Sequence, residues 1–550
     1  MTAALLAAVF VWIVATLPPR PATASDLPAN ATQRIVAGAV HIHSTRSDGV
    51  GDREAIAAAA ASAGLRFVAI TDHGDATRTP DAPAYLHGVL CLDGVEISTN
   101  GGHYLALDMA AAPYPLGGEP AAVAEDVKRL GGFGVAAHPD SAKPLLRWTD
   151  WAVPIDGIEW LNLDSEWRDE SRGRLARAVF DSLFRKGPAL ASVLDRPVAT
   201  LDHWDALTAR RPVVGLAGHD AHGGWSQRVE DGERRGLPGL PSYEASFRTF
   251  AIRAVLDDEL SGDAGRDARL VFRALRAGRL FTAVDAIAAP AWVDLRSTSR
   301  AGIVEMGQQG PYVEGGELSA RATLPRGGLI TLLRNGKALV QVGSNELKAT
   351  PSGPGAYRVE VSAPRAPGTP PVPWIVTNPI YLTAGPTPVD APDPPVTPIA
   401  DVNDHGVVEK DRLSTASLTS DGRRWGFEYH LGEGSRAGQY AALAISIQPS
   451  HPAFNALTFT ASAPRAMRVS VQVRYGIGGG VRWVRSIYLA PGAQTISLPL
   501  ERFLPVETTD PRPSSSLVQT ILFSVDLVNA TPNSTGQFEI SNLKLATVGR

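Results

Sequence analysis

Residues 35–43, IVAGAVHIH, decide the fold: an apolar, β-branched run ends in two histidines. The run predicts a strand over residues 35–40. Side chains at i and i+2 of an extended chain point to the same face, so His41 and His43 offer their rings to one spot. A second pair with the same spacing, Asp220 and His222, follows the apolar run 213–217. Both pairs therefore predict clustered metal-binding groups just after strands.

The chain between these pairs, and a little beyond them, alternates strand-like and helix-like segments from about residue 35 to 285. Such alternation indicates a mostly parallel sheet or a β/α barrel. The expected strands cover residues 35–40, 66–71, 89–97, 104–109, 133–137, 155–161 and 213–217. The expected helices cover residues 52–64, 119–131, 171–186 and 266–277.

The second half of the chain changes character. Residues 288–385 hold short alternating runs that predict a small β-sandwich. Residues 386–404 are rich in proline and predict a stiff, extended linker. Residues 405–550 are again β-rich and predict a jelly-roll sandwich. A length of 550 residues agrees with several domains.

The N-terminal apolar run, residues 3–17, is shorter than a typical membrane span of roughly 20 residues. With Ala22-Thr23-Ala24 after it, residues 1–24 predict a cleaved signal peptide, although no Lys or Arg precedes the run. We therefore expect export to the periplasm or the extracellular space, with an uncleaved anchor as the alternative. The formal net charge is −4 and there is one cysteine, so neither a nucleic-acid backbone nor a disulfide framework is expected.

Nine of the twelve histidines lie between residues 41 and 222, and six of them sit at or just after strand ends. One histidine alone would be unremarkable, but six with carboxylates beside them predict a multinuclear metal centre. Active sites of β/α barrels are built at the C-terminal ends of the strands, where these residues fall. The candidate metal ligands are His41, His43, Asp48, His73, Glu96, His103, His138, Asp220 and His222.

Six short segments carry a family resemblance: HIHSTRSDG, AITDHGD, GVEIS, GGHYLAL, AAHPD and GHDAH. In content and order they resemble the motif series of the PHP (polymerase and histidinol phosphatase) superfamily of metallohydrolases, over roughly residues 36–285. The resemblance implies a distorted seven-stranded β/α barrel. A shorter match, PWIVTNPIYL at residues 373–382, is similar to the carbaryl-hydrolase branch of that superfamily.

The resemblance also implies how the ligands divide among two or three divalent ions. His41, His43, Glu96 and Asp220 would hold one ion, and Glu96 would bridge to a second. By the same resemblance, His103 and His138 would hold the second ion. Asp48, His73 and His222 would hold a third. Mixed imidazole and carboxylate ligands suit Zn, Mn or Fe.

The chemistry expected of such a centre is hydrolysis by a metal-bridging hydroxide, because bound ions lower the pKa of water toward about 7. Glu96, Asp220 and His222 are the candidate catalytic residues. Lys143, Arg147 and Asn162 are candidate substrate contacts. For the two cations the alternative is a solvated loop, and for Asn162 it is a turn residue.

Three functions remain open at this point. The favoured one is an exported phosphoesterase that acts on a small-molecule or polymer-attached ester. A carbamate or carboxylic ester hydrolase of the carbaryl-hydrolase type is the rival, supported by four tryptophans near the expected site: Trp148, Trp151, Trp160 and Trp167. The third is a cell-surface glycan-binding protein in which the C-terminal sandwich supplies the function. Trp374, Trp425 and Trp483 could stack on sugars there or form cores.

Overall fold

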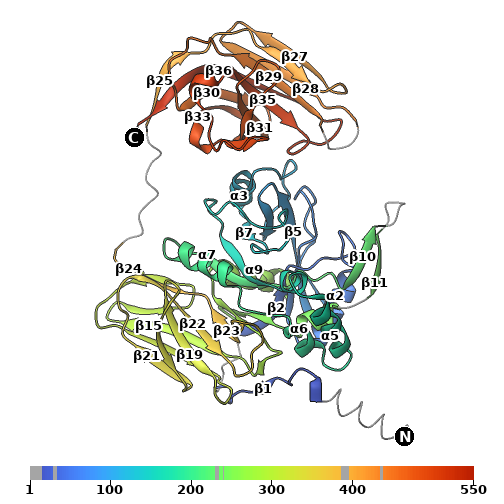
Figure 1. Ribbon diagram of the computed structural model, residues 1–550, viewed down its shortest axis with the longest axis vertical. Helices are drawn as coiled ribbons and strands as arrows, with labels where there is room; N and C mark the ends of the chain where they lie inside the picture. Colours follow the sequence, from blue (N-terminus) through green and yellow to red (C-terminus); the bar gives the residue numbers. More distant parts are fainter. Residues whose placement is uncertain are drawn as a thin grey trace. The chain divides into compact units, whose positions relative to one another are not determined.

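The structure, a computed structural model, describes residues 15–28, 34–228, 234–238, 241–385, 395–433 and 438–549. The chain forms two compact units (Figure 1). The first holds residues 1–74, 79–110 and 127–387, and the second holds residues 75–78, 111–126 and 388–550. The first unit mixes helices and strands, whereas the C-terminal block of the second is all β.

The strands of the first unit that carry the site follow one hydrogen-bonded path. In order along that path they are β2 (Ile35–Val40), β3 (Phe67–Ile70), β5 (Val89–Thr99), β6 (Gly102–Leu107), β7 (Phe133–Ala136), β8 (Gly157–Asn162) and β9 (Val214–Gly218). Pairing is parallel except at β5–β6 and β6–β7. The path returns to its start through a parallel bridge between Ile42 and Ala221, and the His219 N–H donates to the Val40 carbonyl (3.1 Å).

Helices connect and cover these strands. They are α2 (Arg53–Ser62), α3 (Pro120–Arg129), α4 (Leu163–Arg168), α5 (Arg172–Ser182), α6 (Lys186–Ala191), α7 (Val198–Thr208), α8 (Tyr243–Phe247) and α9 (Ala264–Arg276). Side-chain caps set several starts, such as Asp52 for α2 and Asp263 for α9. The expected helix over residues 171–186 is wrong at its end, because α5 stops at Ser182 and α6 begins at Lys186.

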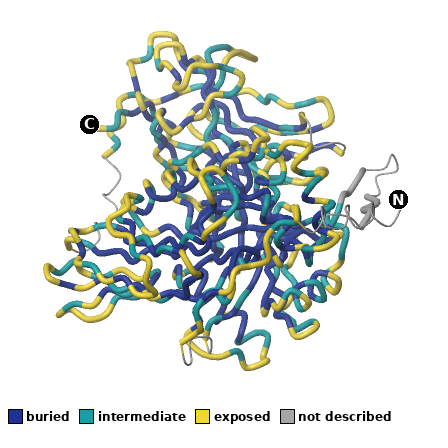
Figure 2. Tube along the Cα trace, turned by 60° about the horizontal axis from the view of Figure 1, so that its bottom comes forward, coloured by how far each residue is buried: buried dark blue, intermediate teal, exposed yellow. Residues whose placement is uncertain are grey.

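Two more strands extend the path on the other side of β2. They are β12 (Ala251–Val255) and β13 (Leu280–Ala283), and both pair antiparallel. β13 then pairs with β23 (Ile375–Thr377), so the sheet continues into residues 288–385. β13 and β23 are buried along their whole length, and Figure 2 draws such buried chain in dark blue.

Residues 288–385 form two sheets, but one of them is the continuation just described. β23, β22 (Gly355–Ser362), β24 (Ile380–Thr383), β17 (Gln309–Pro311), β19 (Leu329–Arg334) and β20 (Lys337–Val342) belong to the large sheet. The separate sheet holds β16 (Gly302–Glu305), β15 (Val293–Ser299), β18 (Glu317–Ala322) and β21 (Glu346–Ala349). The sequence pattern did not predict a shared sheet.

One buried side chain joins two strands that do not pair with each other. Asn378, at the end of β23, donates from Nδ2 to the carbonyls of Gly215 in β9 (2.8 Å) and Leu280 in β13 (3.1 Å). Its Oδ1 accepts from the Gly215 N–H (2.8 Å). The carboxamide thus supplies the hydrogen bonds that a neighbouring strand would supply to Gly215. This residue belongs to the segment PWIVTNPIYL, which therefore has a structural role here.

The C-terminal block is a sandwich of two six-stranded sheets. One holds β27 (Thr415–Ser420), β28 (Arg424–His430), β36 (Thr535–Val548), β30 (Ala456–Ala463) and β33 (Gly492–Pro499), with β25 (Val396–Asp401) on β36. The other holds β26 (Val407–Lys410), β29 (Tyr440–Ser446), β35 (Thr520–Asp526), β31 (Met467–Arg474), β32 (Arg482–Leu489) and β34 (Leu504–Val506). Trp425 and Trp483 are fully buried in its core, and Trp374 is fully buried in the first unit.

The linker predicted over residues 386–404 is shorter than expected at its C-terminal end. Residues 386–394 lie outside the described residues, but β25 occupies 396–401 and pairs antiparallel with β36. Pro398 is accommodated at a register shift, as expected for proline in a strand next to a bulge.

Part of the predicted signal segment also takes part in the fold. Residues 1–14 lie outside the described residues, whereas β1 (Ala22–Thr23) pairs parallel with β14 (Ala288–Ala289). Over the described residues, no helix has the length and apolarity that a membrane crossing requires.

Candidate metal centre

The structure brings all nine predicted metal ligands together. His41 and His43 come directly after β2, and His73 after β3; Glu96 and His103 lie in β5 and β6. His138 follows β7, and Asp220 and His222 follow β9. The ligands therefore lie after the ends of β2, β3, β7 and β9, near the end of β5 and at the beginning of the antiparallel β6. Side chains up to 181 residues apart in the sequence meet at one place.

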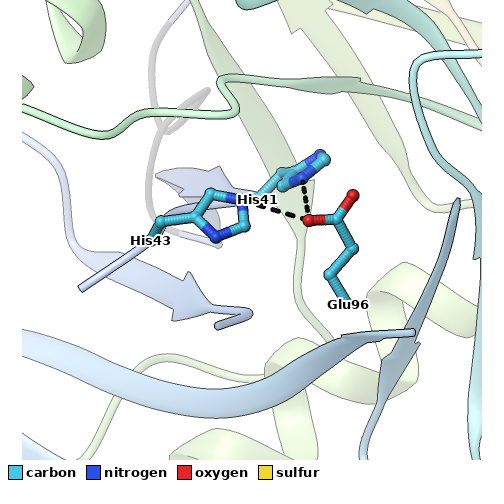
Figure 3. A group of neighbouring side chains, drawn as sticks. All are labelled: His41, His43 and Glu96. Carbon is cyan, nitrogen blue, oxygen red and sulfur yellow. Dashed lines mark ion pairs between the residues drawn. The ribbon is translucent and has the colours of Figure 1, made fainter. Parts of the chain in front are cut away.

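The Glu96 carboxylate points toward the rings of His41 and His43 (Figure 3). Its Oε2 is 3.3 Å from His41 Nε2, 3.2 Å from His43 Nε2 and 3.1 Å from His73 Nδ1. Its Oε1 is 2.6 Å from His103 Nδ1 and 2.9 Å from His138 Nε2. The two oxygens thus face different sets of imidazoles, which is the geometry that a bridging carboxylate needs.

Asp220 faces the same two histidines as the Glu96 Oε2 atom. Its Oδ1 is 3.4 Å from His41 Nε2 and 3.1 Å from His43 Nε2. Asp48 completes the other side, where its Oδ2 lies 3.5 Å from His73 Nε2 and 3.4 Å from His222 Nε2. The ligand atoms form overlapping groups of three within 4.8 Å, for instance His41, His43 and Glu96. Each of these groups could bind a metal ion. Because the groups share residues, they do not determine how many ions bind.

Hydrogen bonds fix the orientation of three imidazoles. Nδ1 of His41 donates to Glu159 Oε1 (2.7 Å), Nδ1 of His138 to the Leu146 carbonyl (3.1 Å) and Nδ1 of His222 to the Asp220 carbonyl (2.8 Å). In each neutral ring the proton then sits on Nδ1, so that Nε2 carries the lone pair toward the cluster. This tautomer is the one that a metal ligand requires.

Glu159, in β8, is an important residue that we did not predict. Its side chain is buried; Oε1 accepts from His41, and Oε2 accepts from the His138 backbone N–H (2.7 Å) and from Asn162 Nδ2 (2.9 Å). It therefore orients two ligands while touching none of the other carboxylates. A signal was present in the sequence, since Glu159 is the lone charge in the apolar strand GIEWL. A Cβ on Gly218 would lie only 1.8 Å from Glu159 Oε1, so β9 needs glycine there.

Asp72 is a second residue that we did not single out. It is buried next to His73 and accepts hydrogen bonds from the Ser44 N–H (2.7 Å), the Ser44 hydroxyl (2.6 Å) and the Ser47 hydroxyl (2.7 Å). These bonds hold the loop that carries Asp48. Because Asp72 and His73 are adjacent in an extended segment, one side chain faces the loop while the next faces the cluster.

The backbone is left-handed at three of the ligands. The φ angles are 61° at His41, 30° at His138 and 47° at Asp220. Non-glycine residues rarely adopt positive φ, and such residues concentrate at functional sites. The strained backbone turns each of these side chains away from the strand direction and toward Glu96.

Electrostatics couple the histidines to the carboxylates. Burial by itself would lower the pKa of His43, but the neighbouring Asp220 and Glu96 carboxylates raise it to about 10. Burial would raise the pKa of Glu96, yet His41, His103 and His138 hold it well below its usual range. Without metal, the cluster is thus made of imidazolium–carboxylate pairs, and a binding metal ion replaces those protons.

The residues present fit divalent metal ions. His41 Nε2, His43 Nε2 and Glu96 Oε2 are fully buried and, within the described part of the chain, have no hydrogen-bond partner although they lie close together. Leaving buried polar atoms unpaired is costly, and a bound ion removes that cost. Six imidazoles and three carboxylates also match the ligand preference of Zn, Mn and Fe.

The predicted substrate contacts have other partners in the structure. Asn162 caps α4, since its Oδ1 accepts from the Ser165 N–H (2.9 Å), and it donates to Glu159. Arg147 is exposed and its Nε donates to the Ser141 carbonyl (3.1 Å). Lys143 is exposed in the same loop. A role of these three residues in substrate binding stays a prediction.

The tryptophans near the site differ in exposure. Trp148 and Trp160 are buried in the core, and Trp151 stacks on His203 with ring centroids 3.9 Å apart. Trp167, in α4, lines a cavity of about 490 Å³ whose other wall includes Asp48, Asp220 and His222. Of these four tryptophans, Trp167 is the one in that cavity wall.

Comparisons with known proteins give limited likenesses. No family model matches the chain, and no curated protein matches it. Among solved structures, it is similar to a two-domain protein containing a predicted PHP-like metal-dependent phosphoesterase from Bacteroides vulgatus, with 14% identity over 62% of this chain and 95% of that one and a TM-score of 0.28. It is also similar to a family 11 carbohydrate-binding module from Clostridium thermocellum, with 18% identity over 27% of this chain and 94% of the module and a TM-score of 0.22. With TM-scores this low, neither likeness adds to what the side chains show.

Proposed function

We propose that this protein is a metal-dependent hydrolase of the PHP type that cleaves phosphoesters. One observation carries the proposal: five imidazoles converge on the Glu96 carboxylate, whose two oxygens face different members of that set. The ligand sets are those that the resemblance implies, in a seven-stranded barrel over residues 35–287. Two or three divalent ions, Mn, Zn or Fe, are the proposed cofactors.

Bound divalent ions supply Lewis acidity and a nucleophile derived from water at neutral pH. The chain's own residues do the rest. Glu159 keeps the proton of His41 on Nδ1, and the Leu146 carbonyl does the same for His138, so both rings present a lone pair. Asp220 and His222 border the cavity; His222 Nε2 would hold an ion, and the carboxylate oxygen of Asp220 that does not bind an ion would accept and return a proton.

The charge of the site favours a phosphoester over a neutral ester. Asp48, Glu96 and Asp220 bring three negative charges, and a bound hydroxide would bring a fourth. Two divalent ions balance these four charges, and three ions leave the loaded site positive, so that it attracts an anionic substrate. The carbamate or carboxylic ester hydrolase remains the second candidate, because Trp167 gives the cavity an apolar surface.

Export and glycan binding complete the proposal. We propose that residues 1–24 direct export and that the sandwich over residues 405–550 has glycan as its candidate partner. Trp425 and Trp483 cannot form a sugar-stacking platform there, because both are fully buried. Glycan binding would therefore use other residues of the sandwich.

The deciding experiment compares aryl phosphates with aryl carbamates on the Mn- or Zn-loaded protein, next to the Glu96→Gln variant. We expect phosphate ester turnover by the wild type and its loss in Glu96→Gln, together with a lower metal content by mass spectrometry. Glu346→Gln, an exposed glutamate of β21, is the matched control and should behave like the wild type. Turnover of the carbamate alone would sink the phosphoesterase assignment. Full activity of Glu96→Gln would refute the bridging role.

A further inference from the structure

The cavity beside the metal cluster has a second wall made by α4 and its neighbours. Asp48, Asp220 and His222 form the metal side, while Leu163, Asp164, Trp167 and Arg168 come from α4. The helix begins directly after β8 and is capped by Asn162, which also bonds Glu159. The same short segment thus orients the ligands and faces the space in front of them. A volume of about 490 Å³ is that of a small-molecule site.

Arg168 is the cation of this wall. Its Nε donates to Asp164 Oδ2 one turn earlier, which fixes the guanidinium on the helix. Among the residues that the structure describes, its two terminal nitrogens make no hydrogen bond, and Arg168 lines the cavity, so these nitrogens are available to a ligand. Partial burial alone would lower the pKa of Arg168, but the carboxylates of Asp164, Asp220 and Asp48 raise it, which shows how near the metal side lies.

The rest of the wall is apolar. Leu163 is buried, and Trp167, Leu175 and Pro241 are half-buried in the same cavity. An indole that is partly exposed in a cavity offers a flat face for a ring of the ligand. A planar cation next to an apolar surface is a pairing that suits a molecule with an anionic head and an apolar body.

We propose that α4 selects the substrate, with Arg168 binding the anionic group of a phosphomonoester and Trp167, Leu163 and Leu175 holding an aromatic-sized, apolar alcohol part. This inference rests on the proposed phosphoesterase function and narrows its substrate class. Arg168 takes the place that Lys143 and Arg147 were predicted to fill, since neither of those residues lines the cavity. A small polar phosphoester would leave the apolar wall in contact with water.

The test measures binding without turnover, by titration calorimetry of phenylphosphonate and methylphosphonate into the metal-loaded protein. We expect the wild type to bind phenylphosphonate about tenfold more tightly, as a hydrophobic pocket discriminates by roughly 10–200-fold. Trp167→Ala should remove this preference. Arg168→Gln should weaken both ligands about tenfold or more through loss of a charge-assisted hydrogen bond, and Arg168→Lys should recover part of the loss.

Matched controls lie outside the cavity. Trp151→Ala removes the tryptophan that stacks on His203, and Arg172→Gln removes an exposed arginine at the start of α5. Both should bind the two phosphonates as the wild type does. An unchanged preference in Trp167→Ala, unchanged affinities in Arg168→Gln, or no measurable binding of either phosphonate would each overturn the proposal. If the phosphonates bind as expected but no phosphoester is hydrolysed, the phosphoesterase function is refuted and the binding role of α4 is supported. If phosphoesters are hydrolysed but the expected binding preferences are absent, the function is supported and the binding role of α4 is refuted.

Discussion

At the scale of single residues, the site is built in two layers around Glu96. The inner layer consists of the nine ligands, and the outer layer holds them through Glu159 and Asp72. Glu159 reaches His41, the His138 backbone and Asn162 with one buried carboxylate. Groups that orient metal ligands in this way commonly matter nearly as much as the ligands.

The substitution Glu159→Gln tests this outer layer. A carboxamide can accept from His41 with one oxygen only, so the other contacts are lost or reversed. We expect metal affinity to fall by about 10–100-fold while the fold is retained. Competition with a chromophoric chelator measures the affinity, and circular dichroism checks the fold. Glu346→Gln is the control, and an unchanged affinity in Glu159→Gln would contradict the assigned role.

Residue by residue, the sequence located the inner layer far better than the outer one. His41, His43, Asp220 and His222 stand out because their spacing and residue types are those of metal ligands. Glu159 was missed because one carboxylate in an apolar strand has no spacing pattern, and its partner His41 is 118 positions away. Arg168 was missed because its relation to the cluster depends on α4, a helix of six residues that the periodicity did not predict.

At the scale of elements, strand β9 delivers Asp220 and must also leave room for Glu159. Gly218 is the point of closest approach between β9 and that carboxylate. A Cβ at this position can be accommodated only if the buried Glu159 carboxylate shifts, because the three nearest atoms that it would meet belong to that side chain.

We therefore expect Gly218→Ala to lower stability and metal affinity together. Overpacking of a buried site costs about 1–3 kcal/mol, and the displaced Glu159 no longer orients His41. Gly173→Ala, in the first turn of α5 with no atom within 4 Å of the new Cβ, is the control. It should raise stability by roughly 0.4–1 kcal/mol. Urea unfolding measures the free energy of unfolding of both variants. A change in the same direction in both would contradict the expectation.

The N-terminus of α9 holds a second element-scale feature, the buried carboxylate of Asp267. It accepts from the Ser261 and Gly262 N–H groups (2.9 and 2.8 Å) and from the Tyr85 hydroxyl (2.7 Å). Burial would raise its pKa, but these bonds lower the pKa of Asp267 to about 2. Because the folded value lies below the unfolded value of about 3.9, the stabilisation is complete above that pH and disappears as the pH falls toward 2.

We expect Asp267→Asn to be destabilised relative to wild type at pH 5, by about 1–3 kcal/mol. The gap between the two proteins should narrow as the pH falls from 4 toward 2. Denaturant unfolding at several pH values measures it, with the exposed Asp202→Asn as a variant that should show no gap. A gap that stays constant down to pH 2 would refute the linkage.

At the scale of the whole molecule, the metal ligands lie in or follow six strands between residues 35 and 218. Ions that bind only the folded state stabilise it by mass action, by about 2.7 kcal/mol for each ion at a free concentration of 100 times its Kd. Removal of the ions also leaves imidazolium and carboxylate groups buried together.

Chelation should therefore lower the melting temperature of the first unit, and addition of Mn or Zn should restore it. Differential scanning calorimetry before and after EDTA treatment measures the change. The transition of the C-terminal sandwich serves as the internal reference, because the nine ligands all belong to the first unit. The protein must first be shown to contain metal. If EDTA treatment then leaves the melting temperature of the first unit unchanged, the metal centre does not stabilise the fold.

At this scale the order of the strands was largely predictable from the sequence. The boundary between the first two predicted domains was not, because one sheet runs across it. Alternating segments up to residue 285 predicted the seven strands that carry the site and the helices α2, α3, α5 and α9, since period and turn residues are local signals. The short helices α4, α6, α7 and α8 and the strands β12 and β13 were not predicted. The continuation of the sheet from β13 into β23 is a pairing between segments almost a hundred residues apart. Local patterns carry no information about such a partner.

Asn378 gives this shared sheet a practical meaning. A protease site or a truncation near residue 287 would look harmless from the sequence, because it falls between two predicted domains. It would nevertheless detach the carboxamide that satisfies the Gly215 backbone, three residues before Gly218 and five before Asp220. The autonomous piece of this chain that can carry the metal centre therefore extends at least through residue 378, and a shorter fragment would expose the backbone of β9 as an unpaired edge open to aggregation.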